Sequence, residues 1–346
     1  MKKMKILFVG GIVCLFFLAG IGGANLNGDE HHALLKKSIA YYQTIRAKHG
    51  IDDAQQMLKA WFLKQPSVKK VGISNRDMTV EFKDGHKVII LGHTEEKTFG
   101  KPSKPGHGHG HGGSGGGGGG GTNVTSVPTV KNALILDPFD WEGGVFHNPD
   151  LINTIEGYLQ HAGYNCIYLK NNQVTLSVIE HNLSNYGVIY NRGHGGTSGK
   201  TVIISTGEHW TDSTPIKYST EYNNREIVEV MISGPTGWEY FIAYTPKLIQ
   251  NHYNNLPNSL VYMESCESMK SSTMGDAYVG AGAGVYMGWD KSVTVVYGDD
   301  SADTSFNMFC QGKSVDDIAN AIGSDPSTHA NLKYVGDGSL GLVMPS

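Results

Sequence analysis

The feature that most limits the fold is an alternation of short apolar runs with longer amphipathic segments. It starts near residue 129, where strand-like runs such as 133–136, 188–190 and 260–263 are separated by segments with helical spacing. Strands interleaved with helices are typical of a mostly parallel sheet that helices cover on both faces. Residues 129–346 are therefore expected to form an α/β/α sandwich, whose site lies at the carboxyl ends of strands.

Residues 200–244 depart from this alternation. The runs 202–204, 227–232 and 240–244 are strand-like, and the turn Gly234-Pro235-Thr236-Gly237 separates the last two. This pattern predicts a β-ribbon insertion beside the site. Later in the chain, 285–289 predicts a further strand and 340–343 a strand that closes the sheet.

The region 25–98 predicts a small α+β unit of its own. Its first helix spans 33–49, and a second, capped by Asp52 or Asp53, runs through 60–63. A hairpin then joins two strand-like runs, which span 78–82 and 86–91. Two roles remain open for this unit, an accessory domain and a pro-region that covers an enzyme.

Residues 99–128 form a Pro-, Gly- and His-rich linker. The stretch 112–121 is nearly all glycine, cannot bury a core and behaves as a flexible tether. His107, His109 and His111 alternate with glycine, and such imidazoles bind zinc, copper or nickel weakly. A plain low-complexity spacer is the favoured interpretation.

The N-terminus has the layout of a secretory signal peptide. Lysines at its start precede an apolar run over 6–21, and Gly22-Gly23-Ala24 offers a small-residue cleavage site. The run is shorter than the roughly 20 residues of a membrane span. Removal of 1–24 then leaves a secreted or cell-surface protein without a stable membrane span. The net charge of −4, with no basic block, gives nucleic-acid binding no support.

Cleavage of the signal leaves three cysteines, Cys166, Cys266 and Cys310. An odd number in an exported protein argues against a disulfide scaffold and indicates a free thiol. Cys166 lies within a strand-like run and Cys310 follows an apolar cluster, so both are expected in the core. Cys266 alone lies where a strand passes into a loop.

His194 also follows a strand directly, in the run Val188-Ile189-Tyr190-Asn191-Arg192-Gly193-His194-Gly195. If the third and fourth strands are neighbours, this imidazole can take the proton of the Cys266 thiol and create a nucleophile. The backbone N–H groups of Gly195 and Cys266 are candidates for an oxyanion hole, which commonly contributes about 3 kcal/mol per donor.

These segments resemble the caspase-like cysteine peptidases of clan CD, nearest the clostripain and gingipain group. The resemblance covers roughly 132–343 and rests on the His194 segment and on Leu260-Val261-Tyr262-Met263-Glu264-Ser265-Cys266. It implies a caspase-like sandwich with His194 as general base and acid and Cys266 as nucleophile. The chain departs from the usual acidic-Ala-Cys triplet and shows no obvious acid to orient His194.

The resemblance also implies a peptide or protein substrate. Glu264 and Asp290 are candidates for an acidic pocket that favours cleavage after Arg or Lys. Alternatively, both are solvated acids, and Arg192 binds an acidic side chain or has a structural role.

No cofactor is required by the resemblance, although it makes calcium plausible. Asp299, Asp300 and Asp303 offer carboxylates for such an ion, but capping of the following helix is the favoured interpretation.

The expected function is thus a secreted cysteine endopeptidase, with proteolytic release of the N-terminal region as a possible mode of activation. Lys97 and Lys131 are the candidate cleavage positions in this scheme. The alternatives are an exported non-catalytic binding or scaffold module, and a transpeptidase that uses the same two residues.

Overall fold

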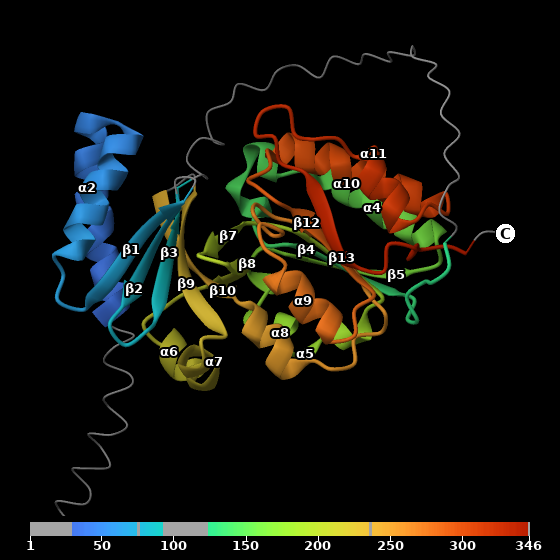
Figure 1. Ribbon diagram of the computed structural model, residues 1–346, viewed down its shortest axis with the longest axis horizontal. Helices are drawn as coiled ribbons and strands as arrows, with labels where there is room; N and C mark the ends of the chain where they lie inside the picture. The colour runs from blue at the N-terminus through green and yellow to red at the C-terminus, as the bar shows by residue number, and fades with distance from the viewer. Residues whose placement is uncertain (1–29, 75–76, 93–123, 235–236, 345–346) are drawn as a thin grey trace, which may run out of the picture.

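A computed structural model describes residues 30–74, 77–92, 124–234 and 237–344 (Figure 1). Two β-sheets form its framework, and helices cover both faces of one of them. The predicted signal peptide, Lys97 and the histidines of the tether lie outside the described residues. Among the described residues, no helix is both long and apolar enough to cross a membrane.

The α/β unit is built on a six-stranded central sheet. The strand order is β5-β4-β6-β11-β12-β13, and every neighbouring pair is parallel except β12 with β13. The bounds are Asn132–Asp137 (β4), Asn165–Lys170 (β5), Val188–Arg192 (β6), Leu260–Glu264 (β11), Val285–Trp289 (β12) and Leu332–Gly336 (β13). The mostly parallel sheet predicted from the alternating pattern is therefore present.

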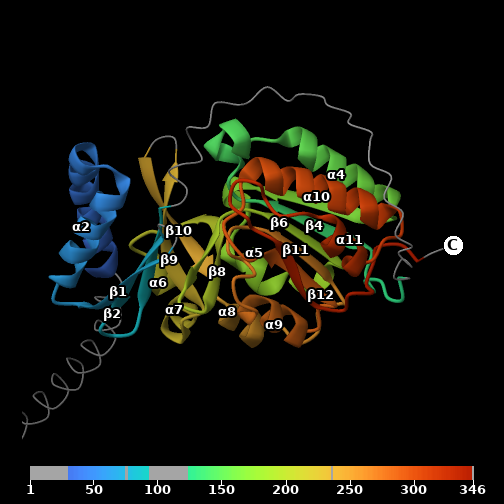
Figure 2. The ribbon, with the colours of Figure 1, turned by 45° about the horizontal axis from the view of Figure 1, so that its top comes forward.

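Each face of this sheet has its own apolar core, because successive side chains of a strand point to opposite faces. Tyr190 and Tyr262 belong to the core under α4, α10 and α11, whereas Ile189 and Met263 belong to the core under α5, α8 and α9 (Figure 2). The helices are Pro149–His161 (α4), Leu176–His181 (α5), Pro246–His252 (α8), Thr273–Gly280 (α9), Val295–Cys310 (α10) and Val315–Ala321 (α11).

A second, seven-stranded sheet combines the N-terminal region with the insertion, in the order β1-β2-β3-β9-β10-β8-β7. Its strands are Val68–Ser74 (β1), Asp77–Phe82 (β2), Lys87–Leu91 (β3), Gly195–Ser198 (β7), Thr201–His209 (β8), Ile227–Gly234 (β9) and Gly237–Tyr244 (β10). β10 pairs antiparallel with both β8 and β9, which is the predicted ribbon. Two short helices, Thr214–Lys217 (α6) and Ser219–Asn224 (α7), precede β9.

The N-terminal region packs the helix over 30–49 and α2 (Ile51–Leu63) against β1, β2 and β3, around an apolar core of its own. The predicted hairpin is present as β2 and β3, while β1 was not predicted. α2 begins after Gly50 rather than at Asp52 or Asp53. The sequence indicates no link to the rest of the chain, yet β3 pairs in parallel with β9, as in Val88 with Glu229.

Two predicted boundaries differ from the structure, one at each end of the α/β unit. Residues 340–343 do not close the sheet, because β13 occupies that edge and Leu340 makes only an isolated bridge to Ser126. The last residues of the predicted linker, 124–128, pack on the same unit, and Val124 is buried there against Gly341.

Candidate functional site

The candidate site lies where the connections of the central sheet diverge. From β4 the chain runs through α4 to β5, and from β5 it returns through α5 to β6 on the other side of β4. Because α4 and α5 lie on opposite faces, the carboxyl ends of β4 and β6 form a topological switch point. Open α/β sheets bind their ligands at such points.

Strand register brings His194 and Cys266 together at this edge. β6 pairs in parallel with β11 from Val188 with Leu260 to Arg192 with Glu264, a constant offset of 72 positions. His194 and Cys266 lie two residues beyond the last pair and keep the same offset. The two strands are therefore neighbours, as the sequence analysis required. The interval between His194 and Cys266 equals the offset between paired residues of β6 and β11.

Gly195 allows the two segments to approach this closely. The chain leaves the central sheet at Arg192 and enters the second sheet at Gly195. A Cβ atom at position 195 would lie 2.7 Å from the carbonyl oxygen of Cys266 and 3.0 Å from Cβ of Ser265. Only glycine fits at this position without a shift of the backbone. The residue after His194 is therefore a glycine because the segment of Ser265 and Cys266 passes so close to it.

The imidazole and the thiol line one small cavity of about 20 Å³. The other residues around it are Phe146, Arg192, Gly193, Glu264, Val293 and Val295. Both His194 and Cys266 are almost completely buried, and Sγ of Cys266 lies 3.6 Å from the carbonyl oxygen of Val293. A cavity of this size holds about one water molecule, so the pair is shielded from solvent in this conformation.

A carboxylate orients the imidazole, which the sequence analysis did not predict. Glu142 ends a short 3-10 helix, Asp140–Glu142, and its Oε1 lies 2.6 Å from Nε2 of His194. The rings of Phe139 and Phe146 flank the imidazole, with centroids 4.4 and 5.2 Å away. Because β4 pairs in parallel with β6, acidic residues soon after Asp137 lie at the same edge of the sheet as His194. A prediction that the two strands are neighbours would have made Glu142 a candidate.

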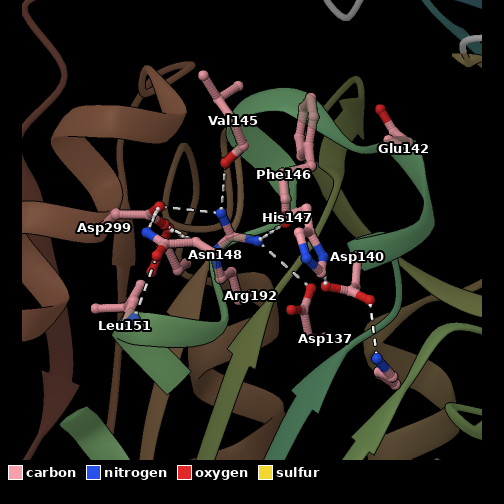
Figure 3. A network of polar contacts seen from close by, with 12 residues as sticks. Asp137, Asp140, Glu142, Val145, Phe146, His147, Asn148, Leu151, Arg192 and Asp299 are labelled. Atoms are coloured by element: carbon pink, nitrogen blue, oxygen red, sulfur yellow. Dashed lines mark hydrogen bonds and ion pairs between the residues drawn. The ribbon is translucent and has the colours of Figure 1, made fainter. Parts of the chain in front are cut away.

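Arg192 fixes the loop that carries Glu142 (Figure 3). Nε and Nη2 donate to the two oxygens of Asp299 at 2.7 and 3.0 Å, and Nη1 contacts Oδ1 of Asp137 at 3.5 Å. Nη1 and Nη2 also donate to the carbonyl oxygens of Phe146 and Val145 at 2.6 and 2.9 Å. A guanidinium has five N–H donors. All five are used within the protein, so Arg192 has a structural role and leaves none for an acidic substrate.

The two predicted pocket acids are both engaged within the protein. Glu264 is buried, accepts a hydrogen bond of 2.6 Å from the Tyr190 hydroxyl, and borders the cavity. Burial and the nearby Asp299 carboxylate raise its pKa well above the ordinary value. Asp290 follows β12 and accepts hydrogen bonds from the backbone and side chain of Asn331, at 2.8 and 3.2 Å.

The other two described cysteines are poor nucleophiles. All three described cysteines are thiols. Burial raises the pKa of Cys166 to about 11 and also raises the pKa of Cys310. Cys310 donates to the carbonyl oxygen of Tyr158 on α4. Since the thiolate is the reactive form, Cys266 remains the candidate nucleophile by position.

The predicted calcium carboxylates all lie within α10 rather than before it. Asp299 accepts a hydrogen bond from Arg192, and Asp303 makes a side-chain hydrogen bond with Tyr158 of α4. In the described part of the chain, the side chains that converge as possible metal ligands are two other groups, His31-Asp84-His86 and Glu180-Glu221-His252.

A larger cavity, of about 490 Å³, lies away from this site. It is lined by residues of β3, β8, β9, α8 and α9, and neither His194 nor Cys266 borders it. Volume alone does not define a reactive site, and the smaller cavity is the one bordered by both Cys266 and His194, whose imidazole contacts Glu142.

Comparison with known proteins adds no assignment, since neither a family model nor a curated protein sequence matches the chain.

Proposed function

We propose that the protein is an exported, caspase-like cysteine endopeptidase, in which Cys266 is the nucleophile and His194 the general base and acid. The observation that carries this proposal is the common register of the two residues beyond β6 and β11. Support comes from the shared cavity and from the Glu142 carboxylate on the imidazole. A nucleophile, a base and a third group that orients the base form the usual arrangement of such sites.

The proton path follows from the contact with Glu142. With Nε2–H donated to Oε1 of Glu142, Nδ1 is the ring atom that accepts the proton of the Cys266 thiol. The thiolate then attacks the substrate carbonyl. His194 returns the proton to the leaving amine, which yields an acyl thioester on Cys266. Water, deprotonated by the same imidazole, hydrolyses the thioester and regenerates the thiol.

The backbone around Gly195 suits a developing oxyanion. Its close approach to Ser265 and Cys266 brings the N–H groups of residues 195 and 266 to the same edge of the sheet. In the proposed mechanism these two donors hold the carbonyl oxygen as it becomes negative, and each contributes about 3 kcal/mol.

The small cavity supports a latent state. A space of about 20 Å³ does not admit a peptide side chain, so substrate binding requires the walls to move. The wall formed by Phe146 is held by Arg192, whereas Val293 lies between β12 and α10, and Val295 is the first residue of α10. We therefore expect the segment 290–295 to move when a substrate binds.

The specificity for Arg or Lys stays a proposal with less support than the mechanism. Glu264 is buried and accepts a hydrogen bond from Tyr190, and Asp290 accepts hydrogen bonds from Asn331. Neither supplies a free anionic group in this conformation. A panel of peptides that end in Arg, Lys, Asn or Asp before a fluorogenic leaving group tests the specificity directly.

The decisive experiment compares the purified protein with Cys266→Ala and His194→Ala in that peptide assay and in labelling by a cysteine-directed acylating probe. We expect both variants to lose at least 10³-fold in kcat/KM, because Cys266→Ala removes the nucleophile and His194→Ala removes the base that activates it and the acid that protonates the leaving amine. Cys166→Ala and Cys310→Ala are matched controls and should keep full activity. Absence of labelling and cleavage in the wild-type protein, before and after limited proteolysis, would overturn the proposal.

A further inference from the structure

Two histidines and an aspartate converge at the boundary between the N-terminal region and the insertion. His31 lies on the first helix, and Asp84 and His86 lie on the turn between β2 and β3. Nε2 of His31 is 3.4 Å and Nδ1 of His86 is 3.2 Å from the same oxygen, Oδ2 of Asp84. All three ligand atoms lie within 4.8 Å of one another.

These distances fit a tetrahedral metal ion. Zinc binds histidine nitrogen and carboxylate oxygen at about 2.0–2.2 Å, which gives a tetrahedron edges of about 3.4 Å. The two separations from Asp84 match such edges. Three protein ligands would leave the fourth position to water.

The hydrogen bond of His86 directs the lone pair of its other ring nitrogen into the centre. Nε2 of His86 lies 3.2 Å from the carbonyl oxygen of Tyr222, which can only accept, so Nε2 carries the proton and Nδ1 is the acceptor. Nδ1 is buried and makes no hydrogen bond of its own. In His31, Nδ1 contacts the Tyr222 hydroxyl at 3.1 Å, and Nε2 faces Asp84. Metal-binding histidines use their second nitrogen in this way.

A salt bridge does not account for this arrangement. The centre is withdrawn from solvent, since His31 and His86 are 5% and 8% exposed. Nδ1 of His86 is an acceptor and lies 3.2 Å from Oδ2 of Asp84, so two acceptor atoms face each other. A cation between them would remove this repulsion.

We propose that His31, Asp84 and His86 bind a divalent transition-metal ion of the zinc class. Because Tyr222 of α7 holds both imidazoles, the bound ion fastens the N-terminal region to the insertion. The side chain of Asp84 is 25% exposed, which provides an entry path. Arg225 donates to the carbonyl oxygen of Asp84, and its charge opposes the ion, so we expect moderate affinity.

The test is a calorimetric titration of the full chain with Zn²⁺. The parent protein carries Cys266→Ala together with His107→Ala, His109→Ala and His111→Ala, which removes the catalytic thiol and the histidines of the tether. We expect one equivalent to bind. Asp84→Asn should weaken binding at least about 100-fold, and Tyr222→Phe about 10-fold through the lost contact with His31.

His252→Gln is the matched control, since it belongs to the other convergent group, and should leave the Zn²⁺ affinity unchanged. Thermal unfolding gives a second readout: zinc should raise the unfolding temperature of the parent and of His252→Gln, but not of Asp84→Asn, and EDTA should reverse the rise. The proposal fails if the parent binds no zinc, or if Asp84→Asn binds it as tightly as the parent. Neither result depends on peptidase activity.

Discussion

Single side chains decide whether the thiol after β11 can act as a nucleophile. Of the three described cysteines, Cys266 alone shares a cavity with an imidazole, and that imidazole contacts a carboxylate at 2.6 Å. An anionic partner stabilises the imidazolium that forms when the thiol loses its proton. Glu142 is therefore assigned as a positioning residue in the proposed mechanism, acting on His194 rather than on the substrate.

Replacement of Glu142 by Gln tests this assignment. The amide can still accept from Nε2–H, but its charge is gone, so we expect kcat to fall about 10- to 100-fold with little change in KM. Asp140→Asn, in the same 3-10 helix, is the control. An unchanged kcat would contradict the assignment of Glu142 as a positioning residue.

At the scale of elements, the register of β6 and β11 was within reach of the sequence, but the loop after β4 was not. Each inner strand is a continuous apolar run that ends in a polar residue, which located His194 and Cys266 at one edge. The position of Glu142 depends on how Arg192 holds the loop, through carbonyl oxygens of Val145 and Phe146. Every residue has a backbone carbonyl, so the residue types at 145 and 146 do not indicate that Arg192 donates to them. Sequence patterns therefore could not predict these contacts.

Asp137, the last residue of β4, should make the free energy of unfolding depend on pH. Burial raises the pKa of Asp137 to about 6, against its usual value near 3.9 in an unfolded chain. Between these values the folded protein holds a proton that the unfolded chain has lost, so the free energy of unfolding falls as pH rises through this window. Asp137→Asn removes this contribution, and its stability relative to wild type should rise by about 2 kcal/mol from pH 4 to pH 7.

Chemical denaturation at several pH values measures this difference. Asp140 is the matched control: although burial opposes it, hydrogen bonds from His147 and Lys170 lower the pKa of Asp140. The stability of Asp140→Asn relative to wild type should therefore fall as pH rises through the acid range. A parallel response of the two variants would contradict the assigned shifts.

At the scale of the whole molecule, the N-terminal region is built into the fold. β3 lies between β2 and β9, and its Ile89 and Leu91 are fully buried in a core shared with Phe139, the residue that flanks His194. Composition could not predict this, because the glycine-rich linker gives the appearance of two separate units. Cleavage of the linker alone would leave this core in place, so it should not suffice to release the region.

This leads to a test on the intact protein. A specific protease site introduced between residues 105 and 115 allows the linker to be cut after folding, and the two parts should then co-elute in gel filtration. β3 pairs with β9 over four residue pairs, and its buried side chains hold the interface. Ile89→Asp should separate the parts once the linker is cut, whereas Lys70→Asp, on the exposed side of β1, should not. If the wild-type parts separate on cleavage, the N-terminal region is a releasable pro-region, and activation by release regains its support.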